Sequence, residues 1–332
     1  MSRSHFRTVW GGYQSKAVSL IRMIAMLLIV TCHFMQAMDI ELAWWFNVGV
    51  QIFLCISGWI YGSRRIAEVT SFYHRRFIKI LVPYYIVYIT FGLATFLFAK
   101  TSFDVLSFIR GLFLNATIQG AGHLWFVPTI LMCYVLIPGL QSYRERYVTS
   151  DRKWWIFTIV STGIMTVFFG AFDRFFNPAW ISCFTLGYAI GSAEGKGYKA
   201  CKTFAKMLGI YAVIGNTIQV YCSYIGNVHF IGYSFFCSYN HVALGIAFFL
   251  LMKKWFSNLN MEGLDRLLCI SDKFSYEVYL VHALIILGPF SLVNLTKWPL
   301  INICVILALI CMMTWILKQS ERLIYRVLLH SD

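Results

Sequence analysis

The sequence has few charged residues for its length. Only 13% of its 332 residues are Asp, Glu, Lys or Arg, whereas 59% are hydrophobic, and the mean hydropathy is +0.68. A soluble domain usually carries about 25% charged residues, with which it covers its surface. The deficit excludes an ordinary soluble globular protein and indicates that lipid surrounds much of the chain.

Paired cysteines and repeats are also lacking. The ten cysteines stand singly, without a CxxC pair, and most lie inside apolar runs, where cysteine behaves as a small hydrophobe. We therefore expect neither a disulfide scaffold nor a metal site. Because no low-complexity tract, long linker or convincing repeat divides the chain, we predict a single domain over residues 1–332. The first apolar run lacks a cleavable signal pattern and should remain as a membrane span.

Long apolar runs are abundant instead. A helix needs roughly 20 apolar residues to cross the hydrocarbon layer. Runs of this kind lie near 17–38, 44–62, 78–99, 123–140, 154–171, 177–193, 205–225, 229–252, 275–293 and 299–317. A shorter stretch at 105–118 is typical of a re-entrant or interfacial helix. The sequence thus predicts an all-α, polytopic membrane protein with about ten transmembrane helices.

The basic residues give this layout an orientation. With the N-terminus inside, 23 of the 28 lysines and arginines fall on inner segments, four fall on outer loops, and Arg22 lies within a span. Such an asymmetry is the signature of cytoplasmic loops. We therefore expect both termini to be cytoplasmic. The net charge of +14 is then a topology signal, and no nucleic-acid partner is expected.

An arginine and a histidine interrupt the first apolar run. Arg22 and His33 are eleven residues apart, which on an α-helix is three turns plus about 20°, so both side chains share one face, roughly 16 Å apart along the axis. Ionisable residues inside a span are costly and by default suggest function. The plainer interpretation is that Arg22 reaches to the inner interface and His33 is a packing residue.

Other candidates follow along the chain. A basic cluster with Arg75, Arg76 and Lys79 opens the third run from the inner side, where it would either anchor the helix or bind phosphate groups. We add four supporting or substrate-binding candidates: Ser57, Trp125, Tyr279 and His282. Ser57 lies among small residues, whose ordinary role is close helix packing.

Taken together, these residues resemble the acyltransferase 3 family of membrane acyltransferases over about residues 15–318. The matching features are Arg22-x10-His33, the run from Gly49 to Gly58, Arg76-Phe-Ile-Lys79 before Pro83-Tyr84, His123-Leu-Trp-Phe126, Phe184-Thr-Leu-Gly187-Tyr188 and Ser275-Tyr276 through His282. The family's RxxR patch appears here as RxxK preceded by Arg75, which leaves open which cation takes which role.

The resemblance implies a reaction. Family members move an acyl group, commonly acetyl, from cytoplasmic acyl-CoA to a hydroxyl of a glycan or lipid-linked sugar. The cluster at residues 75–79 would then hold the nucleotide, and Arg22 the pyrophosphate or pantetheine. His33 would act as general base on the acceptor hydroxyl or as a transient acyl carrier. Acetyl-CoA is the expected acyl donor, and no additional soluble domain is expected.

Two other classes compete with this interpretation. A transporter or flippase would line a substrate path with the same arginine and histidine, but it predicts related halves, and we find no such repeat. A lipid-linked glycosyltransferase would need acidic residues within the spans, and the chain has only 14 in all. We expect the protein in a bacterial inner or plasma membrane, with acyl-CoA, membrane lipid and a saccharide acceptor as partners; oligomerisation stays open.

Overall fold

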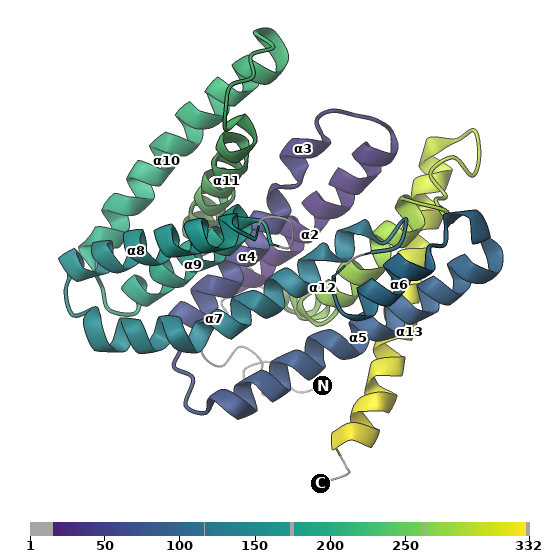
Figure 1. The fold of residues 1–332 in the computed structure, drawn as a ribbon, viewed down its shortest axis with the longest axis horizontal. Coiled ribbons are helices and arrows are strands. Elements are labelled where there is room, and N and C mark those ends of the chain that lie inside the picture. The colour runs from purple at the N-terminus through teal and green to yellow at the C-terminus, as the bar shows by residue number, and fades with distance from the viewer. Residues whose placement is uncertain (1–15, 116, 173–175, 260, 262, 330–332) are drawn as a thin grey trace. The chain divides into compact units, whose positions relative to one another are not determined.

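The computed structural model describes residues 16–115, 117–172, 176–259, 261 and 263–329, and every regular element in that part of the chain is a helix (Figure 1). The α-helices are α2 Lys16–Ala37, α3 Ala43–Phe46, α4 Val48–Gly62, α5 Val69–Phe98, α6 Val105–Leu112, α7 Phe126–Tyr147, α8 Asp151–Gly170, α9 Pro178–Glu194, α10 Lys199–Val220, α11 Tyr233–Phe256, α12 Asp265–Ile286 and α13 Pro299–Leu329. The short helices are η1 Lys100–Ser102, η2 Gly122–Trp125 and the π-turn η3 Tyr221–Ile225. The all-α prediction is confirmed for the described residues.

Seven of these helical segments are long and apolar enough to cross a membrane: α2, α3 with α4, α5, η2 with α7, α8, α11 and α13. The remaining three apolar runs lie on α9, α10 and α12. Helix α9 has only 17 residues, α10 begins with three lysines, and α12 carries several charges. The expected ten spans and the cytoplasmic termini therefore stay predictions.

Several helices differ in extent from the apolar runs. Helix α5 begins nine residues before the predicted run at 78–99, because the basic cluster is itself helical. Helix α12 begins at Asp265, ten residues before its run, and ends at Ile286. The neighbouring runs at 205–225 and 229–252 lie on two separate helices, α10 and α11, with η3 and residues 226–232 between them.

The chain forms two compact units. The first contains residues up to Ile29, Asn47–Ala67 and Val135–Asp272, and the second contains Val30–Phe46, Glu68–Tyr134 and the chain from Lys273 onward. Three helices, α2, α7 and α12, contribute residues to both units. The prediction of a single domain over residues 1–332 is not tested by this division.

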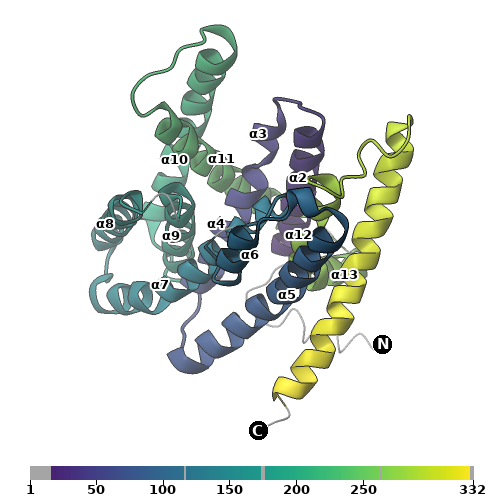
Figure 2. The same ribbon diagram turned by 45° about the vertical axis from the view of Figure 1, so that its right-hand side comes forward.

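The first unit is built around α4 and α9, which pack along each other and lie side by side in both views (Figures 1 and 2). Glycine makes this approach possible. A Cβ on Gly58 would lie 2.0 Å from the Phe184 carbonyl oxygen, and one on Gly187 would lie 2.3 Å from that of Cys55. Helices α8 and α11 cover the pair, and α10 pairs with α11.

The second unit contains α5 and α13, which pack against each other, together with the described second half of α12 (Figure 2). Tyrosines on α5 hold α6 in place: the hydroxyls of Tyr84 and Tyr85 donate to the carbonyls of Gly111 and Leu112 at 2.7 and 3.0 Å. Helix α6 begins after Asp104, whose carboxylate accepts from Ser107, and these hydrogen bonds hold the pKa of Asp104 below its usual value.

All ten cysteines are free thiols in this structure. Seven are buried, Cys269 is half-buried, and Cys304 and Cys311 are exposed on α13. No disulfide links the described residues, so both units are held together by packing and hydrogen bonds.

Candidate active site

Three histidines from distant parts of the sequence meet in the second unit. His33 lies near the end of α2, His123 in η2 and His282 on α12. The ring centroids of His33 and His282 are 5.0 Å apart, those of His123 and His282 are 5.5 Å apart, and those of His33 and His123 are 6.2 Å apart. His123 and His282 are buried, and His33 is half-buried. We call these three residues the histidine cluster.

The hydrogen bonds of the cluster define which ring nitrogen carries hydrogen. A carbonyl oxygen only accepts, so Nε2 of His123, 3.0 Å from the Leu280 oxygen, must donate. Nδ1 of His282 must donate likewise, since it lies 3.0 and 2.8 Å from the carbonyl oxygens of Val278 and Tyr279. Among the described residues, Nδ1 of His123 and Nε2 of His282 have no hydrogen-bond partner.

His33 follows the same pattern. Its Nδ1 lies 2.7 Å from Oε1 of Gln36, one turn later on the same helix. With Nδ1 donating to the amide oxygen, Nε2 of His33 keeps its lone pair and is available to accept a proton or to attack a carbonyl carbon. The ring of His33 is half-buried, whereas those of His123 and His282 are buried.

Tyr279 and Trp125 stand beside the cluster. The Tyr279 hydroxyl donates to the His123 carbonyl oxygen, and the two rings lie 5.6 Å apart, centroid to centroid. Trp125 is half-buried in η2, with its ring 6.0 Å from that of Phe126. Of the four supporting candidates of the sequence, His282 belongs to the cluster, Tyr279 packs against it, and Trp125 stands in the same short helix η2 as His123.

Ser57 is the fourth candidate and lies elsewhere, in the first unit. It is half-buried on α4, between Cys55 and Gly58, at the close contact of α4 with α9. This position agrees with the packing role that small residues have in membrane helices.

Arg22 has an acidic partner that the sequence did not reveal. Its Nη1 lies 3.2 Å from Oδ1 of Asp272 on α12, and both side chains are more than four-fifths buried. Ser19 donates to the same carboxylate from one turn earlier on α2. The ion pair offsets part of the free-energy cost of burying the guanidinium.

The basic cluster lines a pocket in the second unit. Arg75 and Lys79, four residues apart on α5, face Lys318, Glu321 and Tyr325 of α13 across a cavity of about 220 Å³. Lys318 is already paired with Glu277 and Glu321. Arg76, the third cation of the predicted cluster, is not among the lining residues. Within this lining, Arg75 and Lys79 are both exposed side chains.

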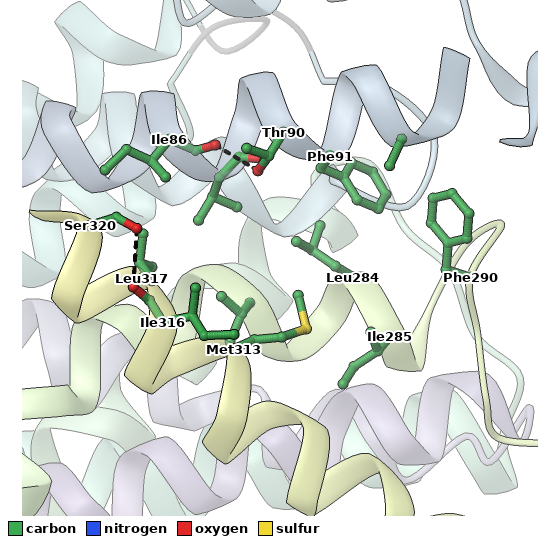
Figure 3. A pocket seen from close by; sticks show the side chains of 13 residues that line it. Ile86, Thr90, Phe91, Leu284, Ile285, Phe290, Met313, Ile316, Leu317 and Ser320 are labelled. Atoms are coloured by element: carbon green, nitrogen blue, oxygen red, sulfur yellow. Dashed lines mark hydrogen bonds between the residues drawn. The ribbon is translucent and has the colours of Figure 1, made fainter. Parts of the chain in front are cut away.

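A larger cavity of about 450 Å³ in the same unit is apolar (Figure 3). Only two of its thirteen lining side chains carry a hydroxyl, and both hydroxyls bond within their own helix: Thr90 to Ile86 and Val87, and Ser320 to Ile316. The rest of the lining, including Phe91 and Met313, is hydrocarbon, aromatic or thioether. This cavity offers no charged or N–H group to a phosphate or a sugar.

Several residues of the site were not predicted as site residues from the sequence. His123 was named only within the motif of the family resemblance, and neither Gln36 nor Asp272 was singled out. His123 stands in the sequence motif with Trp125, which was the available signal. Asp272 is 250 residues from Arg22 in the sequence. Helical periodicity predicts which residues share a face of one helix, but not which residue of another helix that face contacts.

The family model of the acyltransferase domain, acyltransferase 3, matches residues 15–317, nearly the whole chain. No curated protein and no solved structure matches it. The match contains all three histidines of the cluster and the cations Arg22, Arg75 and Lys79.

The chain therefore belongs to the acyltransferase 3 family. Its seven apolar helices and this membership together define a multi-pass membrane protein with an acyltransferase domain.

Proposed function

We propose that the protein is a membrane O-acyltransferase that moves an acyl group, with acetyl the favoured one, from cytoplasmic acyl-CoA to a hydroxyl of a surface glycan or lipid-linked sugar. His33 is the reacting residue. It acts either as general base on the acceptor hydroxyl or as a transient acyl carrier.

The histidine cluster is the observation that carries this proposal. Acyl transfer to an alcohol needs a group that removes the hydroxyl proton as the new ester bond forms. A neutral imidazole with one bare nitrogen does this near neutral pH. Nε2 of His33 is such a nitrogen, since Gln36 occupies Nδ1, and its half-buried ring is accessible.

The donor end is supported by the arginine and lysine side chains. Acyl-CoA carries phosphates at one end and its thioester at the other, joined by a long arm. Arg75 and Lys79 line a pocket that suits phosphate groups, with Arg76 on the same helix. Arg22 precedes His33 by eleven residues on the continuous helix α2, a rise of about 16 Å. That separation is comparable to the reach of the pantetheine arm.

The acceptor and the membrane follow from the same proposal. Acyl-CoA is made in the cytoplasm, so the expected orientation places the basic pocket on that side of a bacterial inner or plasma membrane. Partners are acyl-CoA, a glycan or lipid-linked saccharide, and the surrounding lipid. The net charge of +14 is concentrated on expected cytoplasmic segments, where it also attracts anionic lipid headgroups.

Replacing His33 tests the proposal. An asparagine keeps an N–H near the position of Nδ1, and hence the contact with Gln36, but it removes the reactive Nε2. We expect the His33→Asn variant to release CoA from acetyl-CoA and to form acetyl ester at least 10²-fold more slowly than the wild type. The measurement is acetyl transfer by purified protein with extracts of glycan and lipid-linked saccharide as acceptors.

His229 provides the matched control, because it is an exposed histidine in the loop between α10 and α11. The His229→Asn variant should retain wild-type transfer. A His33→Asn protein that is folded, inserted in the membrane and fully active would contradict both roles given to His33.

A further inference from the structure

The two buried histidines of the cluster present bare nitrogens that the proposed chemistry of His33 does not use. His123 is 6% exposed and His282 is 0% exposed. Each ring uses its N–H for a main-chain carbonyl, and each leaves its other nitrogen without a partner among the described residues. A buried acceptor without a donor is costly, so such atoms mark places where a ligand is expected to supply one.

The chemistry of that ligand follows from the two tautomers. With the N–H groups engaged, Nδ1 of His123 and Nε2 of His282 can only accept hydrogen bonds. No group of three or more metal-binding side chains in the described chain has a geometry that could hold a metal ion. The partner that fits is therefore an O–H or N–H donor, and an acceptor substrate supplies hydroxyls.

We propose that His282, supported by His123, binds a second hydroxyl of the acceptor, next to the one that His33 activates. The rings of His33 and His282 are 5.0 Å apart, so two hydroxyls on neighbouring carbons can each meet one ring nitrogen at hydrogen-bond distance. The site then selects an alcohol with adjacent hydroxyls, as on a sugar ring, over a simple alcohol. This inference rests on the proposed function and specifies its substrate.

His282 is placed for recognition because its ring cannot turn. Two carbonyls of the preceding turn hold Nδ1, and its side chain is fully buried, so Nε2 points in one direction. Tyr279 adds to this rigidity, because its hydroxyl donates to the His123 carbonyl oxygen and thereby holds η2, the short helix that carries His123. A rigid hydrogen-bond acceptor such as Nε2 of His282 discriminates against a substrate that lacks the matching hydroxyl, since the buried nitrogen then stays without a hydrogen bond.

The test compares two alcohols that differ by one hydroxyl. Purified full-length protein is given acetyl-CoA with either cyclohexane-1,2-diol or cyclohexanol, and acetyl ester is quantified by mass spectrometry. The wild type should favour the diol in kcat/KM by at least tenfold, beyond the statistical factor of about two for two hydroxyls. Equal use of the two alcohols, or acetylation of neither by a protein that turns over acetyl-CoA, would overturn the inference.

Two substitutions of His282 sharpen the comparison. Asparagine keeps a donor near the position of Nδ1 and removes the acceptor, so His282→Asn should lower the ratio of diol to cyclohexanol about tenfold. Glutamine places an amide oxygen near the position of Nε2, so His282→Gln should restore much of the ratio. The ratio is the readout, because a merely structural effect would lower both rates together.

The outcomes separate the two proposals. A wild-type protein that neither binds nor turns over acetyl-CoA contradicts the proposed function itself. An active protein whose ratio is unchanged in His282→Asn contradicts only the role of His282. Loss of both rates to the same extent in a folded His282→Asn protein, without recovery in His282→Gln, would show that His282 acts in the chemical step and would also overturn the role in selection.

Discussion

Single residues in the candidate site depend on partners that are close in space and distant in sequence. His123 is held by a carbonyl 157 residues away, and Arg22 is paired with a carboxylate 250 residues away. In each case the partner limits the orientation of a polar side chain inside a largely apolar protein. Orientation is what a reacting or binding group needs, because a misplaced nitrogen or guanidinium loses most of its effect.

The Arg22–Asp272 pair gives a prediction at this scale. Removing Arg22 leaves the mostly buried Asp272 carboxylate without this cation, so Arg22→Met alone should destabilise the protein by about 3 kcal/mol. Replacing both, in Arg22→Met with Asp272→Leu, should recover most of that stability, because no charge remains buried. Thermal unfolding of the two variants in detergent measures the difference.

Activity separates the structural part of this pair from its proposed ligand-binding part. If Arg22 contacts acyl-CoA, the double variant stays impaired in acetyl transfer and shows a raised KM for acetyl-CoA, although its stability has returned. A stable double variant with wild-type KM would assign Arg22 a structural role alone.

At the scale of elements, the contact between α4 and α9 is set by residues without side chains. Gly58, Gly62, Gly187 and Gly191 each bring a backbone carbonyl of the other helix to a position where a Cβ would overlap it. Lipid chains are as apolar as leucine, so membrane helices gain by close backbone packing rather than by apolar area alone. The run from Gly49 to Gly58 therefore encodes a helix contact.

A glycine pair tests this contact. We expect Gly58→Ala to cost about 3 kcal/mol or more, because its Cβ would lie 2.0 Å from a backbone oxygen that cannot move without separating the helices. Gly163→Ala on α8 is the control, since nothing lies within 4 Å of its added Cβ, and it should be neutral or slightly stabilising. Yield and thermal stability of the folded protein measure both. A Gly58→Ala protein as stable as the control variant would contradict this account of the packing.

For the whole molecule, the sequence was enough to predict an all-α membrane protein, but it did not predict which helices contact each other. Each of the ten apolar runs lies on a helix, as hydropathy predicted, because the length of an apolar run can be read from the local sequence alone. The face shared by Arg22 and His33 was also predictable, since α2 is a continuous helix. The meeting of His33 with His123 and His282 was not, because one sequence shows which residues share a helix face but not which faces meet.

Charged helices were the second source of error. Helix α12 carries Asp272 and Glu277 within its length, and each pairs with a cation of another helix. The pairing lowers the cost of burial, so the helix extends ten residues further than its apolar run suggests. Similar reasoning explains α5, whose basic N-terminal turns lie at the pocket with α13.

The number of spans can be tested through parity. Ten spans place the two termini on the same side of the membrane, whereas seven spans would place them on opposite sides. We expect a fluorescent protein fused after residue 332 to fluoresce in the cytoplasm, and alkaline phosphatase at that position to be inactive. The same reporters inserted near Lys297, before α13, should give the reverse result. An active phosphatase at the C-terminus would contradict the even count.

The two exposed cysteines of α13 can report how deeply this helix lies in the bilayer and how it is tilted. Cys304 and Cys311 are seven residues apart, so they lie on nearly the same stripe of the helix and about 10 Å apart along its axis. Nitroxide labels on these native thiols would sample two depths of the bilayer, and their relative exposure to oxygen and to a water-soluble relaxing agent reports the tilt of α13. The seven buried cysteines are shielded from the label, and replacing the half-buried Cys269 by serine confines labelling to Cys304 and Cys311.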